Sequence, residues 1–444
     1  MQTTFSPEQL ADPNVAESEK ILRKCVHCGF CTATCPTYVE LGNELDSPRG
    51  RIYLIKDMLE NGRPADREVV THIDRCLSCL ACMTTCPSGV NYMHLVDHAR
   101  AHIEKTYRRP LIDRLIRTLL AKVMPHPARF RTSLRLAKFG RLFAPLFRSV
   151  PALKPVASML ELTPTAIPPA SEASRPAAHR PDGQIRGRVA LLTGCVQPVL
   201  EPGINEATIR LLTRLGVEVV VPEGEACCGS LTHHMGREDE ALASARHNID
   251  VWTREIERSG LDAIIVTASG CGTTIKDYGY MLRLDPDYRE KAARISALAR
   301  DVTEYLATLE LPDPVLEPGL VAAYHSACSM QHGQRITRQP KELLARAGFI
   351  VKEPREGHLC CGSAGTYNIM HSEIATRLRN RKVRNIEATG AEVVATGNIG
   401  CITQIAGGTR IPVVHTVELL DWAYGGPKPK GVPEAKPAVP VVAA

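Results

Sequence analysis

Aromatic residues and long apolar runs are scarce in this sequence. Aromatic residues make up 5% of the 444 residues, and only two of them are tryptophans. No stretch approaches the ~20 consecutive apolar residues that a membrane-spanning helix requires. Residues 1–20 are polar and mixed in charge, without the basic and apolar regions of an export signal. We therefore expect a cytoplasmic protein that does not span the membrane.

Nucleotide-binding loops are absent as well. The sequence has no G-x-G-x-x-G between a strand and a helix, no Walker loop, and no nucleophile paired with a base. Oxidation of an organic substrate usually requires a two-electron acceptor such as flavin or nicotinamide. We expect a flavin-bearing partner subunit to perform that chemistry.

Acidic residues are nearly missing from one segment. Between Lys105 and Lys154 there are thirteen Lys or Arg and one acid, Asp113, in a chain whose total charge is +6, so the remainder of the chain is net acidic. Such a basic stripe indicates docking to a membrane or a partner subunit, with a solvated helix face as the alternative. Because the stripe lacks aromatic residues spaced for base stacking, we expect no nucleic-acid binding.

Cysteine, in contrast, is abundant, with sixteen residues. Eight of them form two copies of C-x2-C-x2-C-x3-C-P. In this pattern three thiolates on one loop bind one cubane, and the fourth binds the other. We therefore expect two [4Fe-4S] clusters, one held by Cys25, Cys28, Cys31 and Cys86, the other by Cys76, Cys79, Cys82 and Cys35. Zinc favours separated C-x-x-C pairs, and disulfides are rare in a reducing cytoplasm.

The cluster motifs define a helical two-cluster ferredoxin module over residues 21–104, after a flexible N-terminus over 1–20. Between the motifs, Ser47 can cap a helix that begins with Pro48. Arg49 and Arg51 follow, and we expect them to offset the negative charge of the clusters; ordinary surface arginines are the alternative.

The middle of the chain divides into two segments. Residues 105–160 have the pattern of basic amphipathic helices, which we expect to form the core side of a helical subdomain; helices lying in a membrane interface are the alternative. Residues 161–187 are rich in Pro, Ala and Ser and are expected to be a linker. A tail of similar composition over residues 426–444 is expected to be disordered.

The second half of the chain contains an internal repeat. Cys227-Cys228-Gly229 matches Cys360-Cys361-Gly362, and in both repeats a further cysteine lies 32 positions before the pair. Another cysteine follows each pair. We expect two duplicated α/β Cys-Cys-Gly domains, over 188–310 and 320–425, and thus an α+β multidomain protein.

Short apolar strands should bring these distant thiols together. They are expected at 189–193, 217–221 and 263–267, and in the second domain at 321–324, 349–352 and 393–396. Alternating strands and helices favour a parallel sheet, whose strands end at one edge. The converging thiols, which could hold a further cluster, zinc or no metal, are Cys195, Cys227, Cys228, Cys271, Cys328, Cys360, Cys361 and Cys401. Candidate additional ligands are His325, His358, His233 and His234.

Together these motifs resemble the iron–sulfur subunits of bacterial glycolate oxidases. The resemblance covers about residues 20–425 and rests on both Cys motifs, on the runs at 35–38 and 47–51, and on the Cys-Cys-Gly repeats. The wider superfamily includes subunits of anaerobic glycerol-3-phosphate dehydrogenase and heterodisulfide reductase, and lactate-utilisation proteins. Its repeats usually close with C-x-x-C, whereas Cys271 and Cys401 have no such second thiol, which argues against a five-thiolate cluster.

The resemblance implies a complex with FAD-binding subunits that oxidises glycolate to glyoxylate, and often D-lactate to pyruvate. This chain would be its electron-transfer subunit, not catalytic alone, passing electrons to an acceptor such as quinone at the inner face of the inner membrane. The alternatives are a related complex acting on glycerol-3-phosphate or lactate, and a catalytic subunit of the heterodisulfide-reductase kind.

Overall fold

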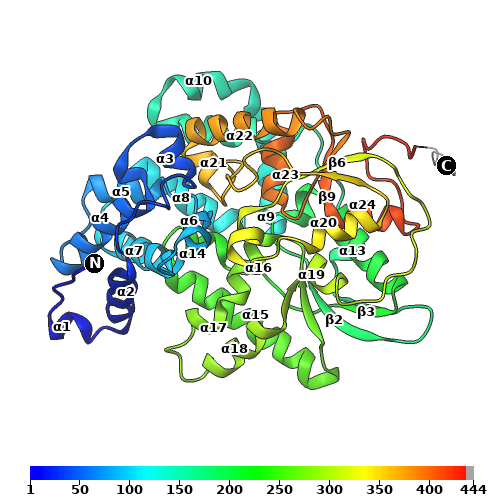
Figure 1. Cartoon of the computed structure of the whole chain (residues 1–444), viewed down its shortest axis with the longest axis horizontal. Coiled ribbons are helices and arrows are strands. Elements are labelled where there is room, and N and C mark those ends of the chain that lie inside the picture. Colours follow the sequence, from blue (N-terminus) through cyan, green and yellow to red (C-terminus); the bar gives the residue numbers. More distant parts are fainter. Residues whose placement is uncertain (437–444) are drawn as a thin grey trace.

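The computed structural model describes residues 1–436 and has three parts (Figure 1). The N-terminal helices, blue to cyan, lie at the left of that view. The first Cys-Cys-Gly repeat, in green, occupies the lower part, and the second, yellow to orange, lies above it. The expected fold class, a helical module followed by two α/β domains, is confirmed.

Helices surround a single apolar core in the N-terminal module. Ser47 Oγ accepts a hydrogen bond from the Gly50 N–H at 3.0 Å, and Pro48 is the first helical residue of α4, as expected. Ile52 and Ile55 of this helix are buried in the module's core. The helices are α1 Pro7–Leu10, α2 Pro13–Lys24, α3 Pro36–Leu41, α4 Pro48–Glu60, α5 Arg67–Asp74, α6 Ala81–Thr85 and α7 Tyr92–Thr106, with the 3-10 turn η1 Glu44–Asp46.

The first 20 residues, expected to be flexible, form α1 and most of α2. Ser6 and Asp12 cap these two helices. Gln9 Nε2 donates to the Glu60 carbonyl oxygen at 2.8 Å, and the Met1 amino group donates to that of Arg23 at 3.0 Å. Capping and polar contacts therefore hold this segment on the module, together with Met1 and Phe5, which pack against the module's apolar core.

The basic segment differs from its expected role as the core side of a subdomain. Ile116 and Leu120 of α8 are buried against Ile369 of the second repeat, but ten other large apolar residues of the segment are exposed. The helices are α8 Leu111–Val123, α9 Pro127–Gly140, α10 Ala144–Ser149 and α11 Lys154–Glu161, with 3-10 turns η2 Arg141–Phe143 and η3 Pro151–Leu153.

The first repeat contains a parallel sheet of β2 Gly187–Leu192, β3 Val217–Val221, β4 Ala263–Val266 and β5 Ala299–Asp301. Its order is β3-β2-β4-β5, with Val189 of β2 in register with Val219 and Ala263 on either side. The helices are α12 Gln197–Leu200, α13 Gly203–Arg214, α14 Ser230–His234, α15 Glu238–Ser259, α16 Ser269–Lys276, α17 Tyr278–Met281, α18 Arg289–Leu298 and α19 Val302–Leu306.

The second repeat has the same topology. Its strands are β6 Val321–Tyr324, β7 Ile350–Lys352, β8 Val393–Thr396 and β9 Val413–His415, all parallel in the order β7-β6-β8-β9. The duplication seen in the cysteines therefore extends to strand order. The helical segments are the π turn η5 Ser329–Gly333, α20 Gln339–Arg346, α21 Tyr367–Met370, α22 Ser372–Glu387, α23 Ile399–Ala406 and α24 Thr416–Ala423.

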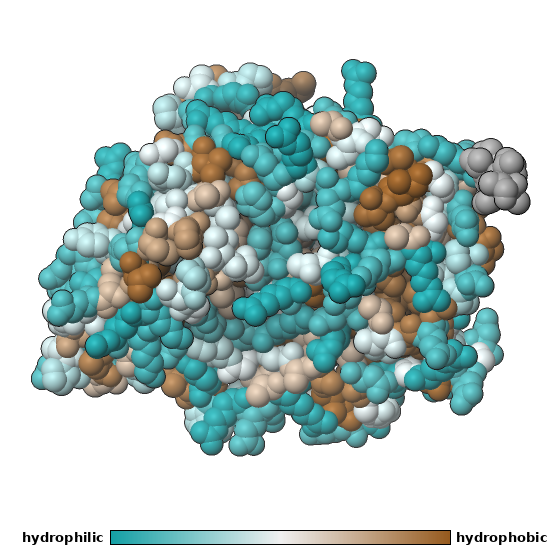
Figure 2. Space-filling model, in the orientation of Figure 1, coloured by the Kyte–Doolittle hydropathy of each residue, from teal (hydrophilic) through white to brown (hydrophobic). Residues whose placement is uncertain are grey.

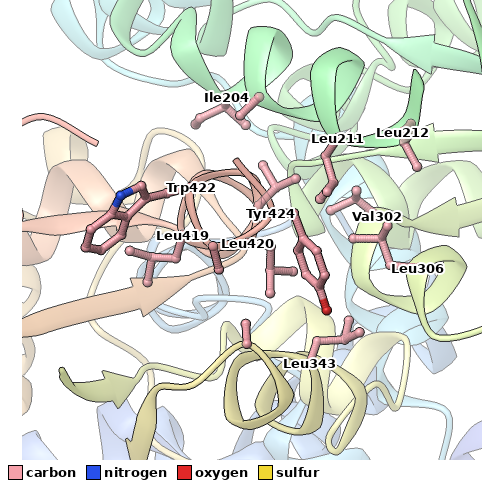
Figure 3. Close-up of a cluster of buried hydrophobic side chains, with 14 of the residues drawn as sticks. Ile204, Leu211, Leu212, Val302, Leu306, Leu343, Leu419, Leu420, Trp422 and Tyr424 are labelled. Atoms are coloured by element: carbon pink, nitrogen blue, oxygen red, sulfur yellow. The ribbon is translucent and has the colours of Figure 1, made fainter. Parts of the chain in front are cut away.

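The two repeats share one hydrophobic core, shown in Figure 3. Helices α13 and α19 of the first repeat pack on α24 and α20 of the second. The labelled side chains of this layer are Ile204, Leu211, Leu212, Val302, Leu306, Leu343, Leu419, Leu420, Trp422 and Tyr424. Asp301 and His415 form the same capping box at the starts of α19 and α24. The shared core fixes the two sheets relative to each other.

Two segments expected to be loose contact the repeats. Within the linker segment, η4 Glu172–Ser174 precedes β1 Ala177–His179, which pairs antiparallel with β3. In the C-terminal segment, Val432 is buried and the Lys436 N–H donates to the Pro318 carbonyl oxygen at 2.9 Å. The remainder of the expected disordered tail, residues 437–444, lies outside the described residues.

Candidate metal centres

The two cysteine motifs fold into loops with the same backbone pattern. His27 and Ser78 occupy equivalent positions with φ of 53° and 49°, and Gly29 and Leu80 do so with φ of 85° and 61°. The left-handed region costs a non-glycine residue about 1–2 kcal/mol. Folded proteins keep such strained residues where surrounding contacts hold them in place, as in loops that bind a ligand. The backbone of both loops is therefore typical of loops that enclose a bound group.

One thiol-lined cavity lies between the first motif and the end of the second. Cys25, Cys28 and Cys31 line it together with Cys86, and Cys82 also reaches its wall. The chain delivers Cys86 there because it directly follows α6. The fourth thiol of the second motif therefore faces the loop of the first.

A second cavity has the reciprocal composition. Cys76, Cys79 and Cys82 line it together with Cys35, which directly precedes α3. Burial and neighbouring thiols raise the pKa of Cys79 and of Cys82 well above the ordinary range, so these thiols release protons when they bind metal. Four thiols in each cavity are the donor sets that two [4Fe-4S] clusters need, so the residues present fit such clusters.

Arg51 is buried between the two motifs, with 1% of its surface exposed. Its Nε donates to the His72 carbonyl oxygen at 2.7 Å and its Nη2 to Thr37 Oγ1 at 2.9 Å. Its Nη1 lies 3.7 Å from Cys35 Sγ. Burial lowers the pKa of Arg51, but the negative charges of the Cys76 thiolate and of other neighbouring groups together outweigh this effect and raise the pKa above its ordinary range. Arg51 therefore places a permanent positive charge beside the second cavity.

Two further side chains complete the cavity walls. Arg49 lines the first cavity, is partly exposed, and pairs with Glu44 at 2.5 Å. Tyr92 lies at the wall of both cavities, and its hydroxyl donates to Cys76 Sγ at 3.8 Å. The sequence pointed to Arg49 and Arg51 but not to Tyr92, whose only signal is its position at the start of α7.

In the first repeat, the strand ends bring the thiols to the carboxyl edge of the sheet. Cys195 follows β2, the pair Cys227 and Cys228 follows β3, and Cys271 lies in α16 after β4. The Sγ atoms of Cys195 and Cys227 are 3.6 Å apart. The expected convergence of thiols is present at this edge.

Three of the candidate histidine ligands lie away from the thiols or at the surface. Nε2 of His233 is 3.2 Å from Asp97 Oδ2, and Nδ1 of His234 is 3.8 Å from Asp97 Oδ1. Although burial opposes it, the charge of Asp97 raises the pKa of His233. The contacts of His233 and His234 with Asp97 therefore join the first repeat to α7. The third candidate, His358, is exposed at the surface. These positions agree with ordinary core or surface histidines, the alternative to metal ligation for His233, His234 and His358.

The second repeat repeats the arrangement of thiols and adds an imidazole. Cys328 follows β6, Cys360 and Cys361 follow β7, and Cys401 lies in α23 after β8. The Sγ atoms of Cys361 and Cys401 are 3.6 Å apart. A ring nitrogen of His325 lies within 4.8 Å of both of these atoms, so the expected candidate His325 does join its thiols.

The glycine of each Cys-Cys-Gly motif is required for two reasons. Gly229 and Gly362 have φ of 81° and 90°, in the left-handed region. A Cβ at Gly229 would lie 3.0 Å from the Ala241 carbonyl oxygen of α15, and one at Gly362 would clash with that of Ala375 in α22. The loop that bears the paired thiols therefore lies directly on a helix.

We expect a Gly362→Ala variant to lose about 2–4 kcal/mol of unfolding free energy, because backbone strain adds to the clash with α22. Urea unfolding of the anaerobically purified chain, followed by circular dichroism, measures this loss. Gly390→Ala is the matched control, since Gly390 has φ of 68° and a Cβ added there would meet no atom within 4 Å. Equal losses in the two variants would contradict the role of close packing.

Family models match the sequence at each of these centres. Residues 21–90 match a 4Fe-4S dicluster domain, and residues 189–276 and 322–406 each match a cysteine-rich domain. These ranges include all sixteen cysteines of the chain. The matches to these family models therefore support the expected iron–sulfur cofactors independently of the distances in the structure.

Relatives match over nearly the whole chain. The glycolate oxidase iron-sulfur subunit of Escherichia coli K12 is 41% identical over 423 residues, covering 95% of this chain and 99% of the relative. The probable glycolate oxidase iron-sulfur subunit of Bacillus subtilis 168 is 32% identical over 423 residues, covering 91% and 94%. Lactate utilization protein A of an Exiguobacterium strain is 29% identical over 240 residues, covering 52% of this chain and 96% of the relative.

A solved structure shares the fold. The crystal structure of a hypothetical protein from Helicobacter pylori matches with a TM-score of 0.54 at 10% identity, covering 95% of this chain and 75% of that one. Within residues 1–436, no helix has the length and apolar character to cross a bilayer. The cysteine cavities, the domain matches and the near full-length relatives agree: the chain belongs to the family of glycolate oxidase iron–sulfur subunits, as an electron-transfer component of an oxidoreductase complex.

Proposed function

We propose that this chain relays electrons in a complex that oxidises glycolate to glyoxylate and also D-lactate to pyruvate. The observation that carries the proposal is the pair of cavities with four thiols each. The 41% identity to a subunit named for glycolate oxidase supports the first substrate. The lactate utilization relatives support the second.

In this proposal the cavities hold two [4Fe-4S] clusters, one bound by Cys25, Cys28, Cys31 and Cys86, the other by Cys76, Cys79, Cys82 and Cys35. When bound, the clusters supply one-electron oxidation and reduction. The cysteine loops hold the thiolates in position, and Arg51 offsets their negative charge. Ile52 and Val90 form a buried apolar wall of the first cavity and limit its contact with water.

The flavin chemistry is assigned to FAD-binding partner subunits, because oxidation of a hydroxy acid removes two electrons at once. The loop of the first cavity is a suitable place for a partner to approach. Cys28 is exposed there, and Val26 and Phe30 present 66% and 63% of their surface. An apolar rim around a thiol brings a docked partner close to the cavity.

We place the chain in the cytoplasm, peripheral on the inner face of the inner membrane, with quinone as the downstream acceptor. The surface that supports this location consists of exposed apolar residues on α9, η2 and α10: Leu136, Phe139, Leu142, Phe143 and Leu146. Hydrophobic side chains reach the surface where α10 lies, at the top of Figure 2. Arg135, Lys138 and Arg141 accompany them, and apolar residues with flanking cations fit the headgroup boundary of an anionic bilayer.

Anaerobic addition of glycolate to the complex purified through this chain tests the proposal. We expect the visible absorbance of the clusters to bleach with glycolate and with D-lactate, and not with glycerol-3-phosphate. A response to glycerol-3-phosphate alone would assign the chain to a related complex. Tightly bound flavin and substrate turnover in the isolated chain would overturn the relay role.

A further inference from the structure

His325 is buried in the second repeat without a hydrogen-bonding partner. It is 1% exposed, and among the described residues neither ring nitrogen has a partner. A buried polar atom left in this state costs about 1–3 kcal/mol. The nearest donor atoms of its group are the thiols of Cys361 and Cys401, within 4.8 Å. An imidazole beside two buried thiols is a set of metal-binding donors.

The first repeat lacks this imidazole. His325 lies three residues before Cys328, and the residue three positions before Cys195 is Leu192, which is also buried. The repeats have the same strand order, so the two positions are equivalent. The imidazole is therefore a specific addition at the second set of thiols.

A buried cation accompanies the second set of thiols. Lys382 is 2% exposed and its Nζ donates to the Glu356 carbonyl oxygen at 2.8 Å. Burial lowers the pKa of Lys382, whereas the negative charge of a Cys328 thiolate raises it. Asn248 stands at the equivalent place in the first repeat, seven residues after the alanine against which the motif glycine packs. A lysine at this place can offset the negative charge of thiols that are ionised by a bound metal.

The second set of thiols also adjoins the ferredoxin module. Cys328 and Cys360 pack in one buried cluster with Leu77, and Cys79 is packed against that cluster. Leu77 and Cys79 belong to the second cysteine motif. A redox centre at these thiols would therefore be next to the second cavity, within reach of electron transfer.

We propose that the second repeat binds a third iron–sulfur centre, with the imidazole of His325 as one of its ligands. The four thiols of the repeat supply the other donors: Cys328, Cys360, Cys361 and Cys401. A His325 ring nitrogen and the Sγ atoms of Cys361 and Cys401 lie within 4.8 Å of one another. Imidazole and thiolate are ligands of both zinc and iron–sulfur centres, so metal analysis decides between the two. The inference rests on the proposed electron-transfer function. One electron passed from the centre at the second cavity oxidises that centre and reduces the third, with no bond made or broken.

Metal analysis and a dithionite titration followed by electron paramagnetic resonance, on the anaerobically purified full chain, test this site without any substrate. Two cubanes account for about eight irons, so we expect an iron content above eight and a third reducible signal. His325→Leu, which installs the residue of the first repeat, should remove or shift that signal alone. His358→Leu, an exposed histidine of the same repeat, should leave it unchanged.

His325→Cys separates ligation from a structural role. A thiolate is more electron-rich than an imidazole, and histidine ligation raises cluster potentials. The cysteine variant should therefore retain the third signal at a lower potential. Zinc at this repeat with about eight irons in total, or an unshifted signal in both His325 variants, would overturn the proposal. A chain that keeps the third signal but fails to bleach with glycolate would instead contradict the proposed substrate.

Discussion

A Cys86→Ser variant is expected to lose the cluster of the first motif and to keep that of its own motif. Cys86 lines the cavity of Cys25, Cys28 and Cys31, whereas the other three cysteines of its motif line the second cavity. Glycolate-dependent electron transfer should fall by roughly 100-fold or more, since even outer-shell changes at metal sites cost 10–100-fold. Electron paramagnetic resonance of the reduced chain is the measurement.

Four cysteine variants, compared in pairs, distinguish the loss of one cluster from general misfolding of the chain. The cluster signal that remains in Cys86→Ser should equal the one that remains in Cys25→Ser. The signal in Cys35→Ser should equal that in Cys76→Ser, and each variant should retain about half of the ~8 irons of two cubanes. If Cys86→Ser instead resembled Cys76→Ser, each motif would hold its own cluster, and the crossed arrangement would be wrong.

An Arg51→Met variant is expected to lose about 3–5 kcal/mol of unfolding free energy, the usual cost of removing one partner from a buried charged network. Arg51 Nη2 lies 3.5 Å from Asp46 Oδ1, and both side chains are buried. Asp46 would be left with His72 and Arg75. Anaerobic urea unfolding of the cluster-loaded chain measures the loss.

Arg49→Met provides the control for that experiment. Arg49 is two residues away and pairs with Glu44, but its side chain is 34% exposed. Exposed ion pairs contribute about 0–1 kcal/mol, so this variant should remain close to the wild-type stability. Because Arg51 also lies beside Cys35, its replacement should lower the reduction potential of the second cluster, whereas a purely structural role would change stability alone.

Local patterns were sufficient for most elements of the sheets and for the donor atoms. The strands expected at 217–221, 321–324 and 393–396 agree with β3, β6 and β8 to the residue. β5 and β9 were missed because each has only three residues, too few for a periodic signal. β7 is equally short but was expected, because it precedes the cysteine pair of the second repeat. A short helix carrying Ile21 and Leu22 was expected before the first cysteine, and it is the end of α2. Helix α1 was missed because it has four residues and none of them is buried, so it has no apolar periodicity.

The spacing of the cysteines predicts which thiols are candidate cluster ligands, because three thiolates of one loop reach one cluster and the fourth reaches the other. The structure agrees with that pairing, since Cys86 lines the same cavity as Cys25. The folded arrangement was needed for the side chains around the thiols. It also decided that Arg51 is buried while Arg49 is partly exposed, and that His325 joins its thiols while His358 does not. Burial and convergence depend on contacts between distant segments, which local spacing does not encode.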